Sequence, residues 1–243
     1  SIQITKVNGR DDSLTVQGAV LRLYDDRGKA DADTAADTDN HIAEATTGSD
    51  GRVTFRELTV GSTGTKTFYY KEVSVPDAYV LDDTVHEITI SYAANNGNPL
   101  ITASNLVNDE KGKIQILKVG DWTVGGTTDE VPLEGAEFGV YRKDDPDTLV
   151  TTLVTGEDGT AISGGLDAGT YILKETKAPD GFASNDKTYE VTVENNKTDT
   201  TWYDTPIENV ANEGRFVLKK YDGSDSAASD DLTGLTGAVF ELY

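Results

Sequence analysis

The chain has 243 residues, of which 43 are acidic and 21 basic, giving a formal net charge of −22. It has no Cys and only two His, which excludes disulfides, thiolate metal sites and cysteine nucleophiles and disfavours a histidine metal site, so no metal or cofactor is predicted. The acidity argues against binding to nucleic acid or anionic lipid, and no run of 18 apolar residues predicts a membrane span.

Short runs of alternating apolar and polar residues follow one another along the chain, separated by turns rich in Gly, Asn and Asp. In chain order the main strands are expected at 2–7, 18–24, 53–55, 68–75, 86–90, 101–105, 114–119, 135–141, 171–177, 189–193, 207–209, 216–220 and 237–243. A period of two with one apolar face is typical of antiparallel β-sandwiches. The sequence therefore predicts an all-β protein.

The strands form a tandem repeat. Each repeat opens on a strand with a lysine near its end, at Lys6, Lys118 and Lys220, and these lysines are 112 and 102 residues apart. Such spacings fit sandwiches of about 100 residues. We expect one sandwich at 1–110 and a second at 111–213. Residues 214–243 are expected to supply the first two strands of an incomplete third sandwich, either truncated or completed by another chain.

Most of the extra length of the first repeat lies in the segment 25–48, which is rich in Ala, Thr and Asp. This segment predicts a solvated acidic loop, because it fails the template of a calcium-binding EF-hand loop. A second local motif, Asn196-Lys197-Thr198, is a glycosylation sequon that has meaning only in a host that uses it.

The three lysines lie on the face of their strand that carries the core residues. Lys6 follows Ile2 and Ile4 at intervals of two, and Lys118 and Lys220 follow two apolar residues in the same way. Lys219 is a weaker rival to Lys220, because it falls on the opposite face. A lysine on the core face is costly unless a partner compensates its charge.

A glutamate and an asparagine also recur at matching positions. Glu72 and Glu175 each come shortly before a Pro-containing turn. In the last strand, alternation places Asn105 and Asn209 on the core face, with Asn108 and Asn212 as the rival residues.

The purely structural interpretation is that the lysine reaches solvent from a strand end, the glutamate pairs with it and the asparagine caps a turn. Two copies of the same Lys, Glu, Asn order favour a chemical interpretation. Burial disfavours the charged forms, so the amine becomes a nucleophile and the carboxylic acid can polarise an amide and move a proton. The product is a Lys–Asn isopeptide bond, made once with release of ammonia.

The stretch Tyr171-Ile-Leu-Lys-Glu-Thr-Lys-Ala-Pro-Asp-Gly-Phe182 resembles the E-box of Gram-positive pilins and of collagen-adhesin B-type (CnaB-like) domains. Residues 68–79 are a looser copy, with Ala78 where the family usually has Gly, and the Gly-Ala-x-Phe-x-Leu-Tyr strand is also typical of the family. The resemblance implies tandem inverse immunoglobulin-like sandwiches. It implies a Lys6–Asn105 bond catalysed by Glu72, a Lys118–Asn209 bond catalysed by Glu175, and an unpaired Lys220.

The resemblance also implies an extracellular structural protein that is anchored to the cell wall or built into a pilus. The first hypothesis is a stalk or shaft segment of an adhesin or pilin, whose partners are neighbouring domains or subunits. The second is a binding module for a host matrix protein or glycan, with the segment 25–48 as the contact. A turnover enzyme finds no support beyond the single self-directed reaction.

Overall fold

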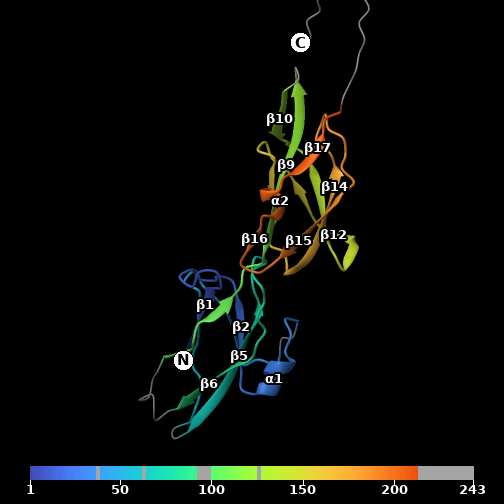
Figure 1. The fold of residues 1–243 in the computed structure, drawn as a ribbon. Helices are drawn as coiled ribbons and strands as arrows, with labels where there is room; N and C mark the ends of the chain where they lie inside the picture. Colours follow the sequence, from blue (N-terminus) through green and yellow to red (C-terminus); the bar gives the residue numbers. More distant parts are fainter. Residues whose placement is uncertain (37–38, 62–63, 92–99, 125–126, 213–243) are drawn as a thin grey trace, which may run out of the picture.

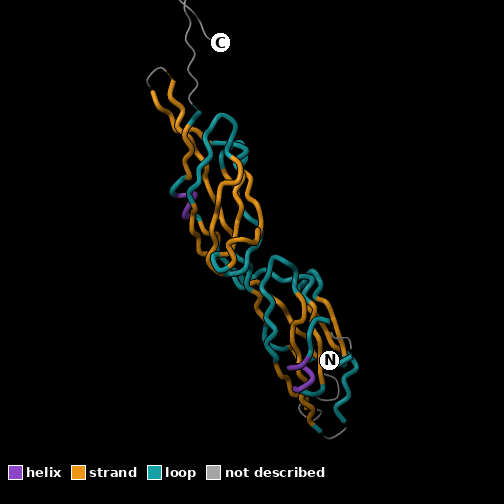
Figure 2. The backbone as a smooth tube through the Cα atoms, turned by 90° about the vertical axis from the view of Figure 1, so that its right-hand side faces the viewer, coloured by secondary structure: helices purple, strands orange, loops and turns teal. Residues whose placement is uncertain are grey.

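The structure is a computed structural model that describes residues 1–36, 39–61, 64–91, 100–124 and 127–212. The described chain forms two β-sandwiches stacked end to end, as Figures 1 and 2 show. No helix in these ranges is long and apolar enough to cross a membrane. The predicted third unit at 214–243 lies outside the described residues.

The first sandwich consists of two sheets. One contains β1 (Ile2–Asn8), β4 (Arg52–Phe55), β7 (Ile101–Thr102) and β8 (Leu106–Asn108), and the other has the order β3 (Ala43–Thr46), β2 (Val20–Tyr24), β5 (Thr65–Ser74) and β6 (His86–Ser91). The second sheet is antiparallel throughout, as predicted, whereas β1 pairs with β7 and β8 in parallel. The first and last strands are therefore direct neighbours.

The second sandwich repeats this plan. One sheet is built on β9 (Lys113–Val124), which pairs with β10 (Thr127–Pro132), β13 (Thr160–Ile162), β16 (Thr198–Asp199) and β17 (Ile207–Val210). The other has the order β12 (Asp145–Val154), β11 (Glu137–Arg142), β14 (Gly169–Lys177) and β15 (Thr188–Val193), and the short helix α2 (Thr201–Asp204) precedes β17. Here too the last strand, β17, runs parallel to the first, β9.

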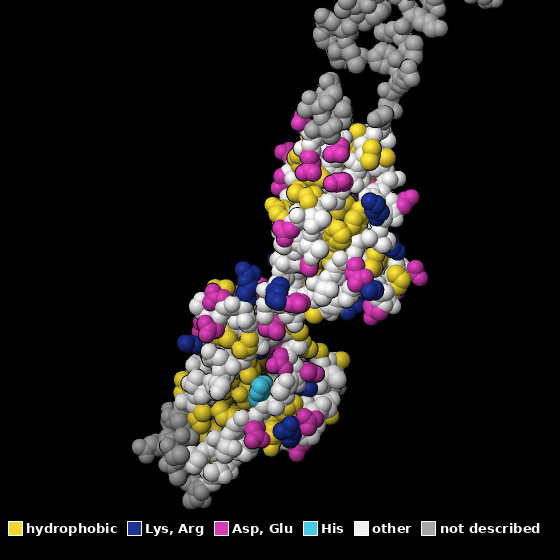
Figure 3. Space-filling model, in the orientation of Figure 1, with side chains coloured by type: hydrophobic (Ala, Val, Ile, Leu, Met, Phe, Trp, Pro, Cys, Tyr) yellow, Lys and Arg dark blue, Asp and Glu magenta, His cyan; other side chains and the backbone are white. Residues whose placement is uncertain are grey.

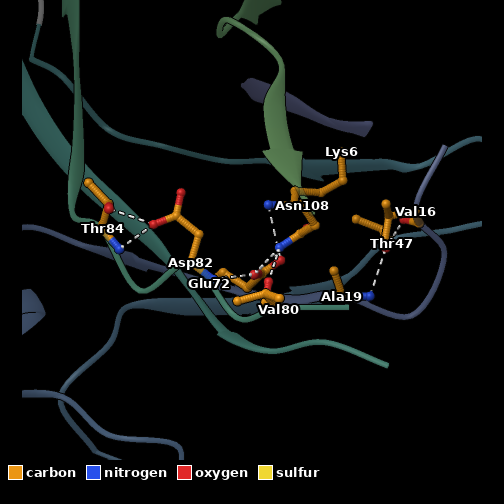
Figure 4. Close-up of polar contacts among 9 residues, drawn as sticks. All are labelled: Lys6, Val16, Ala19, Thr47, Glu72, Val80, Asp82, Thr84 and Asn108. Carbon is orange, nitrogen blue, oxygen red and sulfur yellow. Dashed lines mark hydrogen bonds and ion pairs between the residues drawn. The ribbon is translucent and has the colours of Figure 1, made fainter. Parts of the chain in front are cut away.

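Each sandwich has its own core between its two sheets. The alternation of apolar residues predicts the inward faces, and Ile2, Ile4, Ile114 and Ile116 are all fully buried. A buried threonine also recurs. Thr47 Oγ1 donates to the carbonyl of Val16 and accepts from the backbone N–H of Ala19 (Figure 4), and Thr155 makes the same two bonds to Leu133 and Ala136. The two sandwiches therefore share even these hydrogen bonds from a buried threonine to the loop that precedes β2 in one and β11 in the other.

The acidic segment of the first sandwich is largely exposed, as predicted, but part of it is a helix and one of its acidic side chains is buried. It contains α1 (Arg27–Ala32), which is capped by Asp26 and followed by Asp33, whose side chain is buried. Asp33 Oδ2 lies 3.0 Å from Arg22 Nη1, and its backbone carbonyl accepts a 2.6 Å hydrogen bond from Lys71 Nζ. The segment covers the outer face of β2 and β5, where Arg22 and Lys71 are buried. Each of these cations needs a partner in the buried site, and Asp33 provides one to both. Acidic side chains are scattered over the visible face of both sandwiches rather than gathered on this segment (Figure 3).

A short joint connects the sandwiches, since only residues 109–112 lie between β8 and β9. Asn196, from the turn between β15 and β16, donates from Nδ2 to Asp109 Oδ1 at 2.7 Å and accepts at Oδ1 from the backbone N–H of Glu110 at 2.8 Å. Its own N–H donates to the carbonyl of Glu110 at 2.8 Å. Three hydrogen bonds from one residue therefore tie the second sandwich to the end of the first.

Candidate functional site

The structure places Lys6 inside the first sandwich with its amine facing Glu72. Lys6 lies on β1 and Glu72 on β5 of the opposite sheet, and both side chains are almost fully buried. Their charged groups are 3.1 Å apart, Nζ to Oε1. The ion pair spans the space between the two sheets. Lys6 points inward, as strand alternation predicted, and its amine meets the carboxylate of Glu72 there.

Asn108, not Asn105, completes this cluster. Asn108 lies on β8 and is buried, and its Nδ2 donates to Glu72 Oε2 at 2.7 Å and to the carbonyl of Val80 at 3.0 Å (Figure 4). The carbonyl oxygen of the Asn108 side chain is buried and accepts no hydrogen bond in the described part of the chain. Asn108 thus presents its nitrogen to the carboxyl group, and its carbonyl carbon lies on the buried side of β8.

The prediction that Asn105 lies on the core face was wrong because the last strand is interrupted. The chain leaves the sheet after β7 and re-enters it at β8, and between them the inward position shifts from Ala103 to Leu106. Strand alternation counted across this break gives the wrong face, and Asn105 is exposed. The signal that identifies Asn108 is its match with the second repeat, because Leu106 pairs with Lys6 as Ile207 pairs with Lys118.

The second sandwich brings together Lys118 on β9, Glu175 on β14 and Asn209 on β17. Asn209 Nδ2 donates to both oxygens of Glu175, at 2.8 and 3.0 Å, and its side-chain oxygen is buried with no acceptor bond among the described residues. Lys118 is fully buried and donates from Nζ to the backbone carbonyls of Ile207 at 2.9 Å and Val119 at 3.1 Å. The rival Asn212 is exposed. Lys220 and Lys219 lie outside the described residues.

A glycine turn fixes each lysine. The backbone N–H of Lys6 donates to the carbonyl of Gly51, and that of Lys118 donates to the carbonyl of Gly159, each at 2.8 Å. Both glycines have a positive φ, and a Cβ on either would lie 2.6 or 2.4 Å from the carbonyl oxygen of the lysine. The two Asp-Gly turns therefore need glycine, since any side chain would push the lysine strand away.

Burial lowers the pKa of both lysine amines. Desolvation lowers the pKa of Lys118 to about 8, although the charges of Glu175 and Glu208 act in the opposite direction. Desolvation likewise lowers the pKa of Lys6, opposed by the charge and hydrogen bond of Glu72. A larger share of each lysine is therefore in the neutral, nucleophilic form than in solution.

Sequence reasoning missed a backbone donor to each glutamate. The N–H of Asp82 donates to Glu72 Oε2 at 3.2 Å, and the N–H of Asn185 donates to Glu175 Oε2 at 2.7 Å. Both donors follow their glutamate by 10 residues. The equal offset in the two repeats is the only signal that could have identified them.

The aromatic residue at the end of each E-box lies beside the cluster, with a different neighbour in each sandwich. Phe182 lies against Gly120, where a Cβ would be 2.4 Å from the ring. In the first sandwich Asn8 takes the place of that glycine and donates from Nδ2 to Glu110 Oε1 at 2.6 Å, with the hydroxyl of Tyr79 3.5 Å away. The second cluster is thus bordered by apolar packing and the first by a polar network.

Each cluster can carry out one acyl transfer. An amine of lowered pKa, a carboxyl group and a primary amide are within one buried site, and the carboxyl group contacts the amide nitrogen. That nitrogen is the leaving group when an amine attacks the side-chain carbonyl carbon, and a carboxylic acid can protonate it. A pre-assembled site provides the proximity that such a reaction needs.

Comparison with known proteins identifies the family and the fold of the chain. A family model for SpaA domains with a prealbumin-like fold matches residues 1–105 and 125–206. The "Trypsin-resistant surface T6 protein" of Streptococcus pyogenes serotype M6 is 36% identical over 111 residues, which is 46% of this chain but only 19% of that protein. The chain therefore corresponds to less than a fifth of this curated relative.

Among solved structures, the shaft pilin spaA from Lactobacillus rhamnosus GG superposes with a TM-score of 0.52 at 16% identity, covering 88% of this chain and 98% of that one. Its D295N mutant gives a TM-score of 0.51 at 18% identity, over the same shares of both chains. At these identities the match shows a shared fold: two sandwiches in the arrangement of a Gram-positive pilin.

Proposed function

Since the chain belongs to the family of SpaA domains with the prealbumin-like fold, we propose that it is a stalk or shaft segment whose two sandwiches are each locked by one Lys–Asn isopeptide bond. As a domain pair of a Gram-positive pilin or surface protein, it lies at the cell surface. The observation that carries the proposal is the repeated contact between a glutamate carboxyl group and the nitrogen of a buried asparagine, beside a buried lysine.

The first bond joins Lys6 to Asn108. Lys6 Nζ, made neutral by proton transfer to Glu72, attacks Cγ of Asn108, and the Cγ–Nδ2 bond breaks. The carboxyl group of Glu72 returns the proton to Nδ2, which leaves as ammonia. The attacking nitrogen then carries one proton more than the amide needs. Glu72 accepts this proton and passes it to the departing ammonia, which leaves as ammonium, so Glu72 ends as the carboxylate and one positive charge leaves the site. Two contacts support this role: the 3.1 Å ion pair of Glu72 with Lys6 Nζ and its 2.7 Å hydrogen bond from Asn108 Nδ2, the two nitrogen atoms between which the proton would move.

The second bond joins Lys118 to Asn209 with Glu175 in the same role. Each site reacts once, so the chemistry serves the structure of the chain and turns over no external substrate. Because the product is an amide in a desolvated site, hydrolysis would need water to enter the core.

The position of these bonds suits a protein under tension. In each sandwich the lysine strand and the asparagine strand are parallel neighbours, so the bond connects the first strand directly to the last. A pull on the two ends of a sandwich is then carried by covalent bonds rather than by the hydrogen bonds of the sheet. We expect the partners to be the flanking domains and other subunits of the same surface fibre.

The test is the intact mass of the purified chain under denaturing conditions, followed by peptide mapping. The expected mass is lower than the calculated mass by two molecules of ammonia, with linked peptides containing Lys6 with Asn108 and Lys118 with Asn209. Lys6→Ala and Lys118→Ala should each restore one ammonia, and a Lys111→Ala control should restore none. A parent chain of full calculated mass would contradict the proposal.

A further inference from the structure

Asn185 lies between the glutamate and the asparagine strand of the second sandwich and contacts three strands. Its backbone N–H donates to Glu175 Oε2 of β14 at 2.7 Å. Its side-chain Nδ2 donates to the hydroxyl of Tyr189 on β15 at 2.6 Å and to the carbonyl of Glu208 on β17 at 3.1 Å. Glu208 is the residue directly before Asn209.

We propose that Asn185 is a positioning residue for the cross-linking reaction of the second sandwich. Its side chain ties the segment between β14 and β15 to the strand that carries Asn209, and its backbone N–H holds the carboxyl group of Glu175 against the leaving nitrogen. The inference rests on the function proposed above.

The carboxyl group of Glu175 has no other backbone donor among the contacts that the structure describes. Asn209 holds both of its oxygens, but Asn209 is the group that reacts, so it cannot fix the carboxyl group throughout the reaction. Asn185 contacts the oxygen Oε2 from outside the reacting groups. Small errors in the placement of a proton-transfer group are costly, because the reaction depends on near-contact geometry.

The first sandwich shows what is special about an asparagine here. Asp82 occupies the equivalent position and also donates its backbone N–H to the glutamate, at the longer distance of 3.2 Å. Its side chain, however, accepts from the N–H and hydroxyl of Thr84 within its own turn (Figure 4). The side chain of an aspartate has no N–H to donate to the last strand. Among the described residues, the side-chain hydrogen bond to that strand is therefore found in the second sandwich alone.

Two variants separate the parts of this role. Asn185→Ala removes the tie and frees the segment, while Asn185→Asp keeps the shape and the Oδ1 acceptor for Lys187 N–H but loses both donors and adds a charge. The matched control is Asp186→Asn, which changes a charge on the neighbouring exposed residue. Chains made by cell-free synthesis are chased at a set pH, quenched in denaturant and digested, and ammonia loss is followed separately for each sandwich.

We expect both Asn185 variants to slow ammonia loss in the second sandwich by about tenfold or more, with the first sandwich and the control unchanged. A second readout separates positioning from general stability. In an Asn209→Ala background, which cannot react, the contact with Glu175 should protect the backbone N–H of residue 185 from hydrogen exchange. Asn185→Ala should remove that protection while the amides of the core strands keep theirs.

The outcomes are distinct. Parental rates in both variants would overturn the positioning role. So would a slower rate in which the core amides lose protection together with the amide of residue 185, because that pattern indicates a general loss of stability. To exclude misfolding, Glu175→Ala and Glu175→Ala/Asn185→Ala chains, which cannot react, are compared by circular dichroism and should have the same spectrum. If the parent chain releases no ammonia from either sandwich, the proposed function itself fails.

Discussion

Lys6 forms a 3.1 Å ion pair with Glu72, whereas Lys118, its counterpart in the second sandwich, donates only to backbone carbonyl groups. Both lysine side chains are almost inaccessible to solvent, and desolvation is the largest influence on the pKa of each. In the first sandwich the carboxylate compensates part of this penalty through direct contact. In the second, the ammonium form is held by carbonyl dipoles and more distant charges, and the pKa of Lys118 falls to about 8.

The first prediction concerns the stability of the unlinked second sandwich as a function of pH. In an Asn209→Ala background, Lys118→Met removes the buried ammonium and should stabilise the sandwich at pH 7. The native pKa of about 8 lies below the ordinary value of 10.5, so above pH 8 the unfolded chain binds more protons and the Lys118 chain gains stability. The advantage of Lys118→Met should therefore shrink by up to about 3 kcal/mol as the pH rises from 8 towards 10.5.

Tryptophan fluorescence measures this directly, because both tryptophans, Trp122 and Trp202, belong to the second repeat. Lys113→Met, on the same strand near its start, serves as the control and should show no such change with pH. An advantage of Lys118→Met that grows with pH would contradict the lowered pKa.

The second prediction distinguishes the two asparagines of the first sandwich. Asn108→Ala should abolish the cross-link to Lys6 and raise the chain mass by one ammonia relative to the linked parent, after allowance for the substitution. Asn105→Ala should leave the cross-link intact, since Asn105 is exposed and Asn108 is beside Glu72. The measurement is intact mass under denaturing conditions, and the reverse result would restore Asn105 as the acceptor.

The third prediction separates folding from cross-linking. Glu175→Ala should leave the second sandwich folded but unlinked, because its core cluster does not include Glu175. By analogy with a disulfide that closes a loop of similar length, the missing bond should cost about 4 kcal/mol of unfolding free energy. Thermal unfolding followed by tryptophan fluorescence checks this, with the exposed Glu157→Ala as control. Loss of ammonia from the second sandwich of Glu175→Ala would disprove the assigned role.

The repeats and strand alternation predicted most of the fold and five of the six residues that come together in the two clusters. They succeeded because a lysine and a glutamate at fixed positions in uninterrupted strands inherit the inward face of their neighbours. They failed at Asn105 because the last strand of the first sandwich breaks between β7 and β8, and a break shifts the alternation. Only the pairing of Leu106 with Lys6 in the sheet shows which residues of β8 point inward.

The buried part of the acidic segment was missed for a different reason. Its composition is that of a solvated loop, and nothing in it shows that Asp33 meets Arg22 and Lys71, which lie on distant parts of the chain. A buried contact between residues far apart in sequence leaves no local pattern. The backbone donors Asp82 and Asn185 were missed likewise, because a backbone N–H carries no residue type.

The fourth prediction tests this folded segment. Asp33→Ala should destabilise the first sandwich by about 3 kcal/mol or more, because it leaves Arg22 buried with one partner fewer and removes an acceptor of the Tyr24 hydroxyl. Asp31→Ala, two residues earlier, removes only an exposed ion pair with Arg27 and should cost less than about 1 kcal/mol. Differential scanning calorimetry of the two variants gives the comparison. Equal effects would show that the segment does not stabilise the sheet that it covers.

The fifth prediction concerns the joint between the sandwiches. Asn196 has a φ of 64°, which glycine adopts freely, so Asn196→Gly keeps the turn while removing the two side-chain hydrogen bonds to residues 109 and 110. We expect the variant to leave each sandwich folded but to let them reorient, so that residual dipolar couplings no longer fit a single alignment tensor. Lys197→Ala should behave as the parent, because the ion pair that the Lys197 side chain forms in the described part of the chain is with the nearby Glu194 and not with the first sandwich. The same engagement of Nδ2 with Asp109 should keep the sequon at Asn196 unmodified in a glycosylating host, since the nitrogen that would carry a glycan is already bonded. A single tensor for Asn196→Gly would mean that the backbone contacts of the joint hold the two sandwiches in line without this side chain.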